Sequence, residues 1–256
     1  MANVFELYFN PLKNQKKFGI FGNTIPQKEK LFFETFCFLP KTFFEKKQGH
    51  LYIVAEAKNS FSDNQTPLGG KSLTGQAVIN RLAEILKKYF YQKPVFYSHD
   101  SFQLGLNQMN DFLNQEILQN DRSFLSGFHF ASIVVGPKGN IKVSKVGNIK
   151  IILLRNSEAF DIGSNFTIER ITDKIFPDVI EGSLQKNDRI LMATPEVFQS
   201  FQAEKIIEEL SLCHNPKLVK QVFKQRKKIV REFSGACLLA FVKKHPIISF
   251  LSRFLK

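Results

Sequence analysis

Stretches in which apolar residues alternate with polar ones, or run together as Phe, Ile, Val and Leu, recur along the chain. Such stretches, bounded by Gly, Pro, Asn or Asp, are typical of β-strands. On this basis we predict strands at residues 4–9, 30–38, 50–57, 128–135, 141–146, 149–155, 189–194 and 236–242.

Other segments carry apolar residues at the spacing of an α-helix. Ser72 is placed to cap the first of these helices, and Pro216 suits the first turn of the last one. The strands come in runs and the helices in pairs, which does not fit alternating β-α-β winding. The pattern predicts an α+β domain in which antiparallel sheets are covered by paired helices. The predicted helices span residues 72–91, 101–120, 196–212 (as one or two helices) and 216–233.

A polar break at Gly147-Asn148 separates two of the predicted strands. Glycine and asparagine both tolerate a positive φ, so a plain hairpin turn would explain the pair. The edge of a binding site would explain it equally well. The two interpretations lead to different functions.

Composition and charge narrow the class of protein. The chain has 256 residues with 43% hydrophobic content, enough to fill a sizeable core, and its 28 Phe against no Trp indicate core material. Its first residues contain no basic segment followed by an apolar one, so we expect no secretory leader, and the sequence has no apolar run of about 20 residues. Its three scattered cysteines fit reduced thiols, so we expect a cytoplasmic protein. A formal charge of +13 favours anionic partners.

Five segments occur in the order and rough spacing of a known family: "GHLYIVAEAKNS", "GFHFASIVV", "VSKVGNIKIILLR", "LQKNDRILMATPEVF" and "SGACLLAFV". They resemble the metal-dependent protein serine/threonine phosphatases, the PPM family, over roughly residues 30–242. In that family the corresponding segments end in Asp-Gly, Gly-Asp and Asp-Asn motifs. The resemblance lies in framework and order more than in these motif letters.

The resemblance implies a four-layer α-β-β-α sandwich with two Mg²⁺ or Mn²⁺ ions at one end of the sheets. Hard divalent cations take oxygen ligands, and a metal pair about 4 Å apart generates a hydroxide and neutralises phosphoryl charge. Several convergent carboxylates are needed to hold both ions.

Transferred residue by residue, most of that ligand set is replaced, and the sequence predicts a vestigial metal site. Its positions are Glu56, Ala57, Gly147, Asn148, Pro195 and Ser234. Glu56 is the one position that keeps a carboxylate, as a residual ligand, and Pro195 has no side-chain oxygen. The acidic residue of the family's first strand corresponds to Glu34, with Thr35 where an Asp would be wanted. Gly147-Asn148 then resembles a metal-ligand turn that has lost its charge.

Three functions follow from this assignment. The first is a catalytically inactive pseudophosphatase that acts as a binding or regulatory module, with no catalytic residue, no cofactor and an unidentified protein partner. The second is a divergent metal-dependent phosphatase that needs Mg²⁺ or Mn²⁺, with substitute carboxylates drawn from Asp63, Asp161 or Asp178. The third is a basic module that binds a membrane surface or, less in keeping with the composition, nucleic acid.

Two basic segments bear on the third function. Residues 217–231 form a helix with Lys and Arg on one face and an apolar opposite face, typical of a packed helix or of an anionic docking stripe. We assign residues 1–243 to the phosphatase-like domain and 244–256 to a basic amphipathic tail. That tail is either docked on the domain or lies at the inner face of a membrane.

Overall fold

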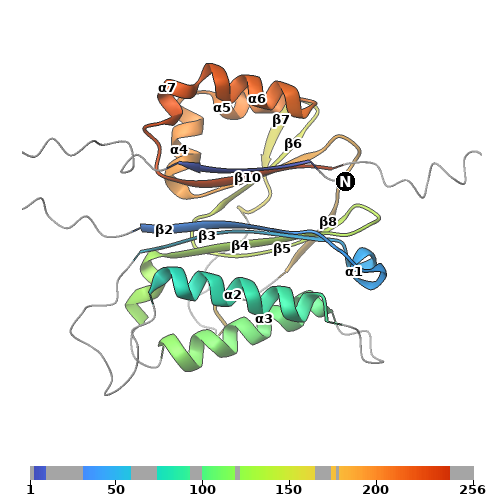
Figure 1. Ribbon diagram of the computed structural model, residues 1–256, viewed down its shortest axis with the longest axis vertical. Coiled ribbons are helices and arrows are strands. Elements are labelled where there is room, and N and C mark those ends of the chain that lie inside the picture. Colours follow the sequence, from blue (N-terminus) through green and yellow to red (C-terminus); the bar gives the residue numbers. More distant parts are fainter. Residues whose placement is uncertain are drawn as a thin grey trace, which may run out of the picture.

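The computed structural model describes residues 3–9, 31–58, 74–92, 100–118, 122–164, 174–176 and 179–242. Two antiparallel sheets pack face to face, with helices on the outer face of each (Figure 1). This is the α-β-β-α sandwich that the resemblance to the PPM family implies. The architecture follows from strands that are buried on both faces and therefore need a cover on each side.

The first sheet has the strand order β2-β3-β4-β5-β8, and every neighbouring pair is antiparallel. Its two central strands are buried along almost their whole length. The strands of this sheet are β2 (Leu31–Phe38), β3 (His50–Lys58), β4 (Phe128–Val135), β5 (Asn140–Val146) and β8 (Ile180–Ser183).

The second sheet has the order β1-β10-β9-β6-β7, again antiparallel throughout. Strand β6 follows β5 in the chain but belongs to this other sheet, so the chain crosses between the sheets at residues 147–149. The strands here are β1 (Val4–Phe9), β6 (Lys150–Arg155), β7 (Glu158–Asp161), β9 (Arg189–Ala193) and β10 (Gly235–Phe241).

Helices α2 (Gly75–Phe90) and α3 (Ser101–Phe112) cover the first sheet, and the remaining helices except α1 cover the second (Figure 1). Those over the second sheet are α4 (Pro195–Ala203), α5 (Ile206–Leu212), α6 (Pro216–Gln225) and α7 (Lys227–Val230). A short helix, α1 (Phe43–Gln48), joins β2 to β3 at one end of the sandwich.

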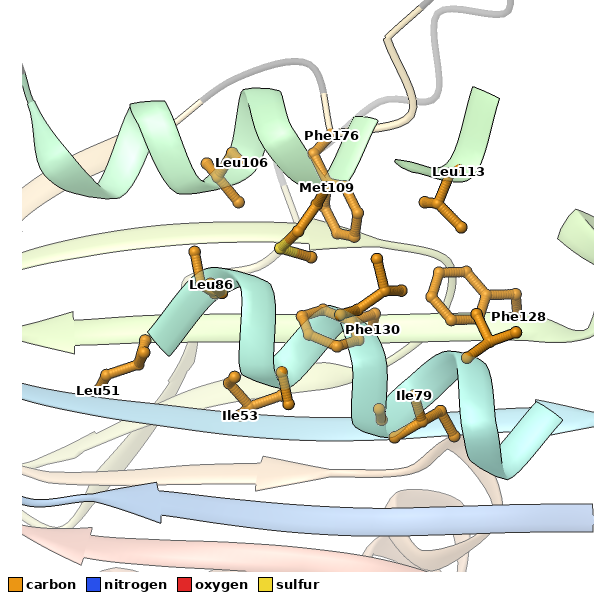
Figure 2. Close-up of a cluster of buried hydrophobic side chains, with 14 of the residues drawn as sticks. Leu51, Ile53, Ile79, Leu86, Leu106, Met109, Leu113, Phe128, Phe130 and Phe176 are labelled. Carbon is orange, nitrogen blue, oxygen red and sulfur yellow. The ribbon is translucent and has the colours of Figure 1, made fainter. Parts of the chain in front are cut away.

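Three apolar clusters fill the spaces between the layers. One lies beneath α2 and α3, where Phe128, Phe130 and Phe176 pack with Met109 and aliphatic side chains (Figure 2). A second lies between the two sheets, and the third lies beneath α4 to α7. Phenylalanine is thus core material here, as the composition indicates.

Several predicted helix boundaries are wrong. Helix α2 begins at Gly75, capped by the Thr74 hydroxyl, and Ser72 lies outside the described residues. The predicted helix 101–120 is α-helical only to Phe112 and continues as a π-helical turn over Leu113–Leu118. The predicted helix 216–233 is divided into α6 and α7 at Arg226. The segment 196–212 forms two helices, one of the two predicted alternatives, which separate at Lys205, where φ is 56°.

The basic segment 217–231 packs as predicted on its apolar side. Val219, Val222, Phe223, Ile229 and Val230 contact the cluster beneath α4 to α7. The opposite face is exposed and carries Lys217, Lys220, Lys224, Lys227, Lys228 and Arg231.

No helix in the described ranges is long and apolar enough to span a bilayer. The predicted tail, residues 244–256, and the domain boundary before it lie outside the described residues.

Candidate functional site

The Gly147-Asn148 turn carries the chain from the first sheet to the second. The plain hairpin interpretation is therefore wrong, because β5 and β6 do not pair with each other. Gly147 has a φ of 72°, and a Cβ at this position would lie 2.3 Å from His129 Nδ1. The backbone N–H of Asn148 donates to that same nitrogen at 3.2 Å. The turn is thus fixed against the beginning of β4.

Glu56 lies opposite His129 in the register of β3 and β4, so the two side chains share the face that looks toward the second sheet. Only 6% of Glu56 is exposed, and its Oε2 atom has no hydrogen-bond partner among the described residues. Burial and then the nearby charge of Glu196 raise the pKa of this carboxyl to about 7, against the opposing charge of Lys58 and a hydrogen bond from Thr194.

The next residue, Ala57, belongs to the cluster beneath α2 and α3. Its side chain therefore points to the other face of the sheet from Glu56, so Ala57 does not share this site.

Two strands of the second sheet reach the same end of the sandwich as Glu56. Thr194 follows β9, and Gly235 begins β10. The Thr194 hydroxyl accepts a hydrogen bond from the backbone N–H of Ala236 at 3.2 Å. Gly235 has a φ of 132°, and a Cβ there would lie 2.1 Å from Thr194 Oγ1. Pro195 follows as the first residue of α4, and Ser234 directly precedes Gly235. The predicted positions other than Ala57 therefore gather at one end of the sandwich.

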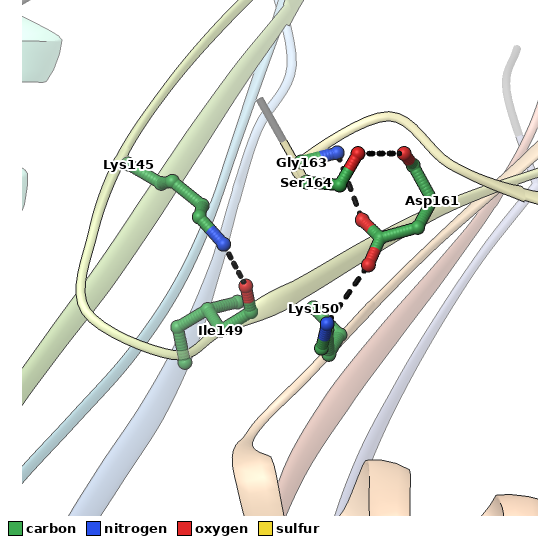
Figure 3. Close-up of polar contacts among 6 residues, drawn as sticks. All are labelled: Lys145, Ile149, Lys150, Asp161, Gly163 and Ser164. Carbon is green, nitrogen blue, oxygen red and sulfur yellow. Dashed lines mark hydrogen bonds and ion pairs between the residues drawn. The ribbon is translucent and has the colours of Figure 1, made fainter. Parts of the chain in front are cut away.

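Lysine side chains supply positive charge at this end. Lys145 is only 9% exposed, and its ammonium donates to the carbonyl of Ile149 at 3.0 Å, across the turn (Figure 3). Burial lowers the pKa of Lys145. Burial also lowers the pKa of His129, and the charges of Lys58 and Lys145 act in the same direction.

A cavity of about 680 Å³ opens beside the turn, between strands β6 and β7 and helices α4 and α5. Asn148, Lys150, Asp161 and Pro195 are among its lining residues, together with Gln199 and Glu208 of the helices. Lys150 and Asp161 form an ion pair at 2.8 Å, and Asp161 also accepts from the backbone N–H of Gly163 at 3.0 Å (Figure 3).

Known structures of the same architecture include a variant of a bacterial serine phosphatase, with a TM-score of 0.58 and 12% identity over 95% of this chain and 98% of that one. The catalytic domain of the serine/threonine phosphatase PstP, in complex with two manganese ions, gives 0.53 and 12% over 83% and 98%. The chain has the PPM phosphatase fold.

The phosphatase domain of the Bacillus subtilis cell fate determinant SpoIIE shares this PPM fold, with a TM-score of 0.50 and 12% identity over 95% of this chain and 93% of its own. No protein-family model matches the sequence, and neither does any curated protein. At this level of identity the likeness establishes the fold, and the chemistry depends on the residues of this chain.

Those residues do not fit the pair of divalent cations that the PPM fold implies. Two such ions need several converging carboxylates. Within the described parts of the chain, no group of three His, Cys, Asp or Glu side chains is arranged to hold a metal. Burial and the charge of Glu196 favour the protonated form of Glu56, Pro195 offers no side-chain oxygen, and Lys145 places a positive charge beside the turn.

Of the three candidate substitute carboxylates, the structure describes one. Asp161 lies near Asn148 and Pro195 in the cavity wall, but Lys150 neutralises it. Asp63 and Asp178 lie outside the described residues.

Glu34 does not join Glu56, because it pairs with Ala55 and so belongs to the opposite face of the sheet. It accepts instead from the Tyr8 hydroxyl at 2.6 Å. Thr35 lies on the inner face and donates to Glu6 at 2.8 Å.

The sequence interpretation missed His129, Lys145 and Glu196. A signal existed for Lys145, because Ile141 and Val143 alternate toward the buried face of β5 and Lys145 occupies the next position of that series. A charged residue where alternation requires an apolar one indicates a functional or buried polar site. His129 and Glu196 carry no comparable signal.

Proposed function

We propose that this chain is a pseudophosphatase, a PPM fold that serves as a binding or regulatory module without phosphatase activity. The observation that supports the proposal best is the balance of charge at the crossover between the sheets. There the buried Glu56 has a pKa of about 7, Lys145 is buried beside the Gly147-Asn148 turn, and Pro195 stands at a would-be ligand position.

The physical reason lies in what a dication must overcome at this place. It would have to displace the proton that burial favours on Glu56 and tolerate the ammonium of Lys145. With few oxygen ligands to offset these costs, affinity should fall to millimolar or weaker. The fold would then keep its surfaces and its cavity for binding.

One observation favours a divergent, metal-dependent phosphatase as the second candidate. The charge of Glu196 acts on Glu56, so two carboxylates are neighbours at this end. If Mn²⁺ or Mg²⁺ bound between them, the ion would remove the repulsion that raises the pKa of Glu56.

Calorimetric titration with Mn²⁺ and hydrolysis of p-nitrophenyl phosphate test the proposal. We expect binding no tighter than about millimolar and hydrolysis indistinguishable from buffer. Two sites of micromolar affinity, or metal-dependent turnover that disappears in Glu56→Ala, would establish the divergent enzyme instead.

A gain-of-function variant tests whether lost ligands are the cause. The double substitution N148D/P195D restores two carboxylates at the crossover and should tighten Mn²⁺ binding at least about tenfold. Asn140→Asp adds a carboxylate to an exposed position at the far end of β5 and is the matched control. Equal affinity of the two variants for Mn²⁺ would contradict the assignment of the crossover as a former metal site.

A further inference from the structure

Helix α1 and the residues before it expose large apolar side chains. Phe43 is 68% exposed, Phe44 is 52% exposed, and Leu39, directly after β2, is 46% exposed. None of the six residues of α1 is buried. Neighbouring exposed apolar side chains of this size are uncommon on a soluble surface and mark an interaction site. We refer to residues 39–47 as the α1 tip.

Positive charge surrounds these rings. Lys41, Lys46 and Lys47 are exposed, and the ammonium of Lys47 lies 4.8 Å from the centroid of the Phe43 ring. The acidic residue of the tip, Glu45, has its carboxylate engaged by the backbone N–H groups of Lys41 and Thr42, at 2.5 and 3.1 Å. The tip therefore combines apolar rings with lysines and a carboxylate that is used internally.

The fold holds this tip in a defined shape. Thr42 and Glu45 form a reciprocal capping box at the start of α1. The Tyr91 hydroxyl at the end of α2 lies 2.9 Å from both the Phe38 and the Gly49 carbonyl oxygens, the points where the chain enters and leaves the tip. Gly49 has a φ of 103° and packs against the backbone of Val135 too closely for any Cβ. The exposed rings are thus presented on a fixed support.

The tip lies at the opposite end of the sandwich from the Gly147-Asn148 turn. Strand β3 begins beside α1 at His50 and reaches Glu56 near its other end. Figure 1 shows α1 projecting beyond the ends of the sheets, and β10 also ends at this side with Phe241. A contact made through the tip would leave the crossover and its cavity accessible.

We propose that the α1 tip docks the protein on an anionic membrane surface. Phe43 and Phe44 insert at the boundary between headgroups and acyl chains, while Lys41, Lys46 and Lys47 contact lipid phosphates. The interface of an anionic bilayer satisfies both properties of the tip, because it offers apolar volume directly beneath a layer of negative charge. This proposal is independent of whether the crossover retains catalysis.

Tryptophan fluorescence tests insertion directly, since the chain contains no Trp. In Phe43→Trp, emission should shift to the blue and be quenched by brominated lipid when the protein meets vesicles of equimolar phosphatidylglycerol and phosphatidylcholine at low salt. Phe160→Trp, at a 44% exposed ring on β7, is the matched control and should remain unquenched. An unquenched Phe43→Trp would overturn the proposal and leave a protein partner to cover the rings.

Co-sedimentation with the same vesicles tests the charges. K46Q/K47Q should weaken binding roughly tenfold to thirtyfold, since each basic residue at such a surface contributes about 1 kcal/mol. K224Q/K228Q removes the same charge from the exposed faces of α6 and α7 and should bind as the unmodified protein does. If both variants lose binding equally, or if only K224Q/K228Q loses binding, the docking surface lies elsewhere. Either result would refute docking through the α1 tip.

The double substitution F43S/F44S completes the test, because it removes the rings and leaves the charge. Binding should fall at least about tenfold, while the thermal unfolding midpoint should stay unchanged because neither ring is buried. Unaltered sedimentation would show that charge alone holds the protein at the surface, contrary to insertion.

Discussion

The buried carboxyl of Glu56 should make the protein lose stability as pH rises. Its pKa lies at about 7 in the fold, against an ordinary 4.5, chiefly because of burial and then because of Glu196. Between these two values the folded protein keeps a proton that the unfolded chain has released. The contribution of Glu56 to the free energy of unfolding is therefore fully present below pH 4.5. It is lost as the pH rises from 4.5 through 7.

The size of this loss follows from the pKa difference. Each pKa unit corresponds to about 1.4 kcal/mol, so above pH 7 the ionised carboxylate costs the fold at most about 3 kcal/mol. Glu56→Gln keeps the shape of the side chain and removes the charge. It should match the unmodified protein at pH 4.5 and be more stable by up to about 3 kcal/mol at pH 8.

Urea unfolding at a series of pH values measures this difference. Glu158→Gln, at an exposed position on β7, is the control and should follow the pH profile of the unmodified protein. If the stability of Glu56→Gln runs parallel to that of the unmodified protein from pH 4.5 to 8, Glu56 is ionised and well solvated in the fold. That result would remove the main support for the proposal that Glu56 is protonated and that the crossover binds divalent cations weakly.

Two further substitutions test the packing around the crossover and an ion pair of the second sheet. Gly147→Ala should destabilise the fold by about 2 kcal/mol, because φ is positive and the new Cβ meets His129. Gly163→Ala is the control, because its Cβ comes no nearer than 3.4 Å to another atom, and it should change stability by less than about 0.5 kcal/mol. If Gly147→Ala and Gly163→Ala lose similar stability in urea unfolding, the close approach of Gly147 to His129 is refuted. Asp188→Ala should cost about 3 kcal/mol, since this buried carboxylate holds the Arg155 guanidinium at 2.6 and 3.0 Å and accepts from the Gln185 N–H. A thermal unfolding midpoint equal to that of the unmodified protein would show that the pair contributes nothing.

The sequence predicted the longer strands well because each buries a face or both faces. It missed β7 and β8, whose residues are mostly exposed and leave no buried face for a hydrophobic pattern to detect. It missed α1 for the same reason, since the Phe43 and Phe44 rings contribute nothing to the core. Elements without buried residues have no signature in the alternation of apolar and polar positions.

The candidate site was predictable in its positions but not in its electrostatics. Order and spacing placed Glu56, Asn148 and Pro195, and the fold brings them to one end. The same turn residues suit a hairpin and a crossover between sheets, so only the pairing of β5 and β6 with other strands could separate the two. The raised pKa of Glu56 depends on Glu196 and on burial by the second sheet, both of which arise from long-range contacts.

The pairing of β1 has a consequence for how the protein is made. Among the strands that the structure describes, β1 pairs with β10 alone, with Val4 opposite Ala240 and Phe9 opposite Gly235. A ribosome must therefore translate some 230 residues after β1 before its partner emerges, and until then the strand has an unsatisfied backbone edge. Closure of so large a loop makes folding slow and keeps nascent chains prone to association. Any truncation that removes β10 would free β1 as well, so the second sheet would lose both strands at once.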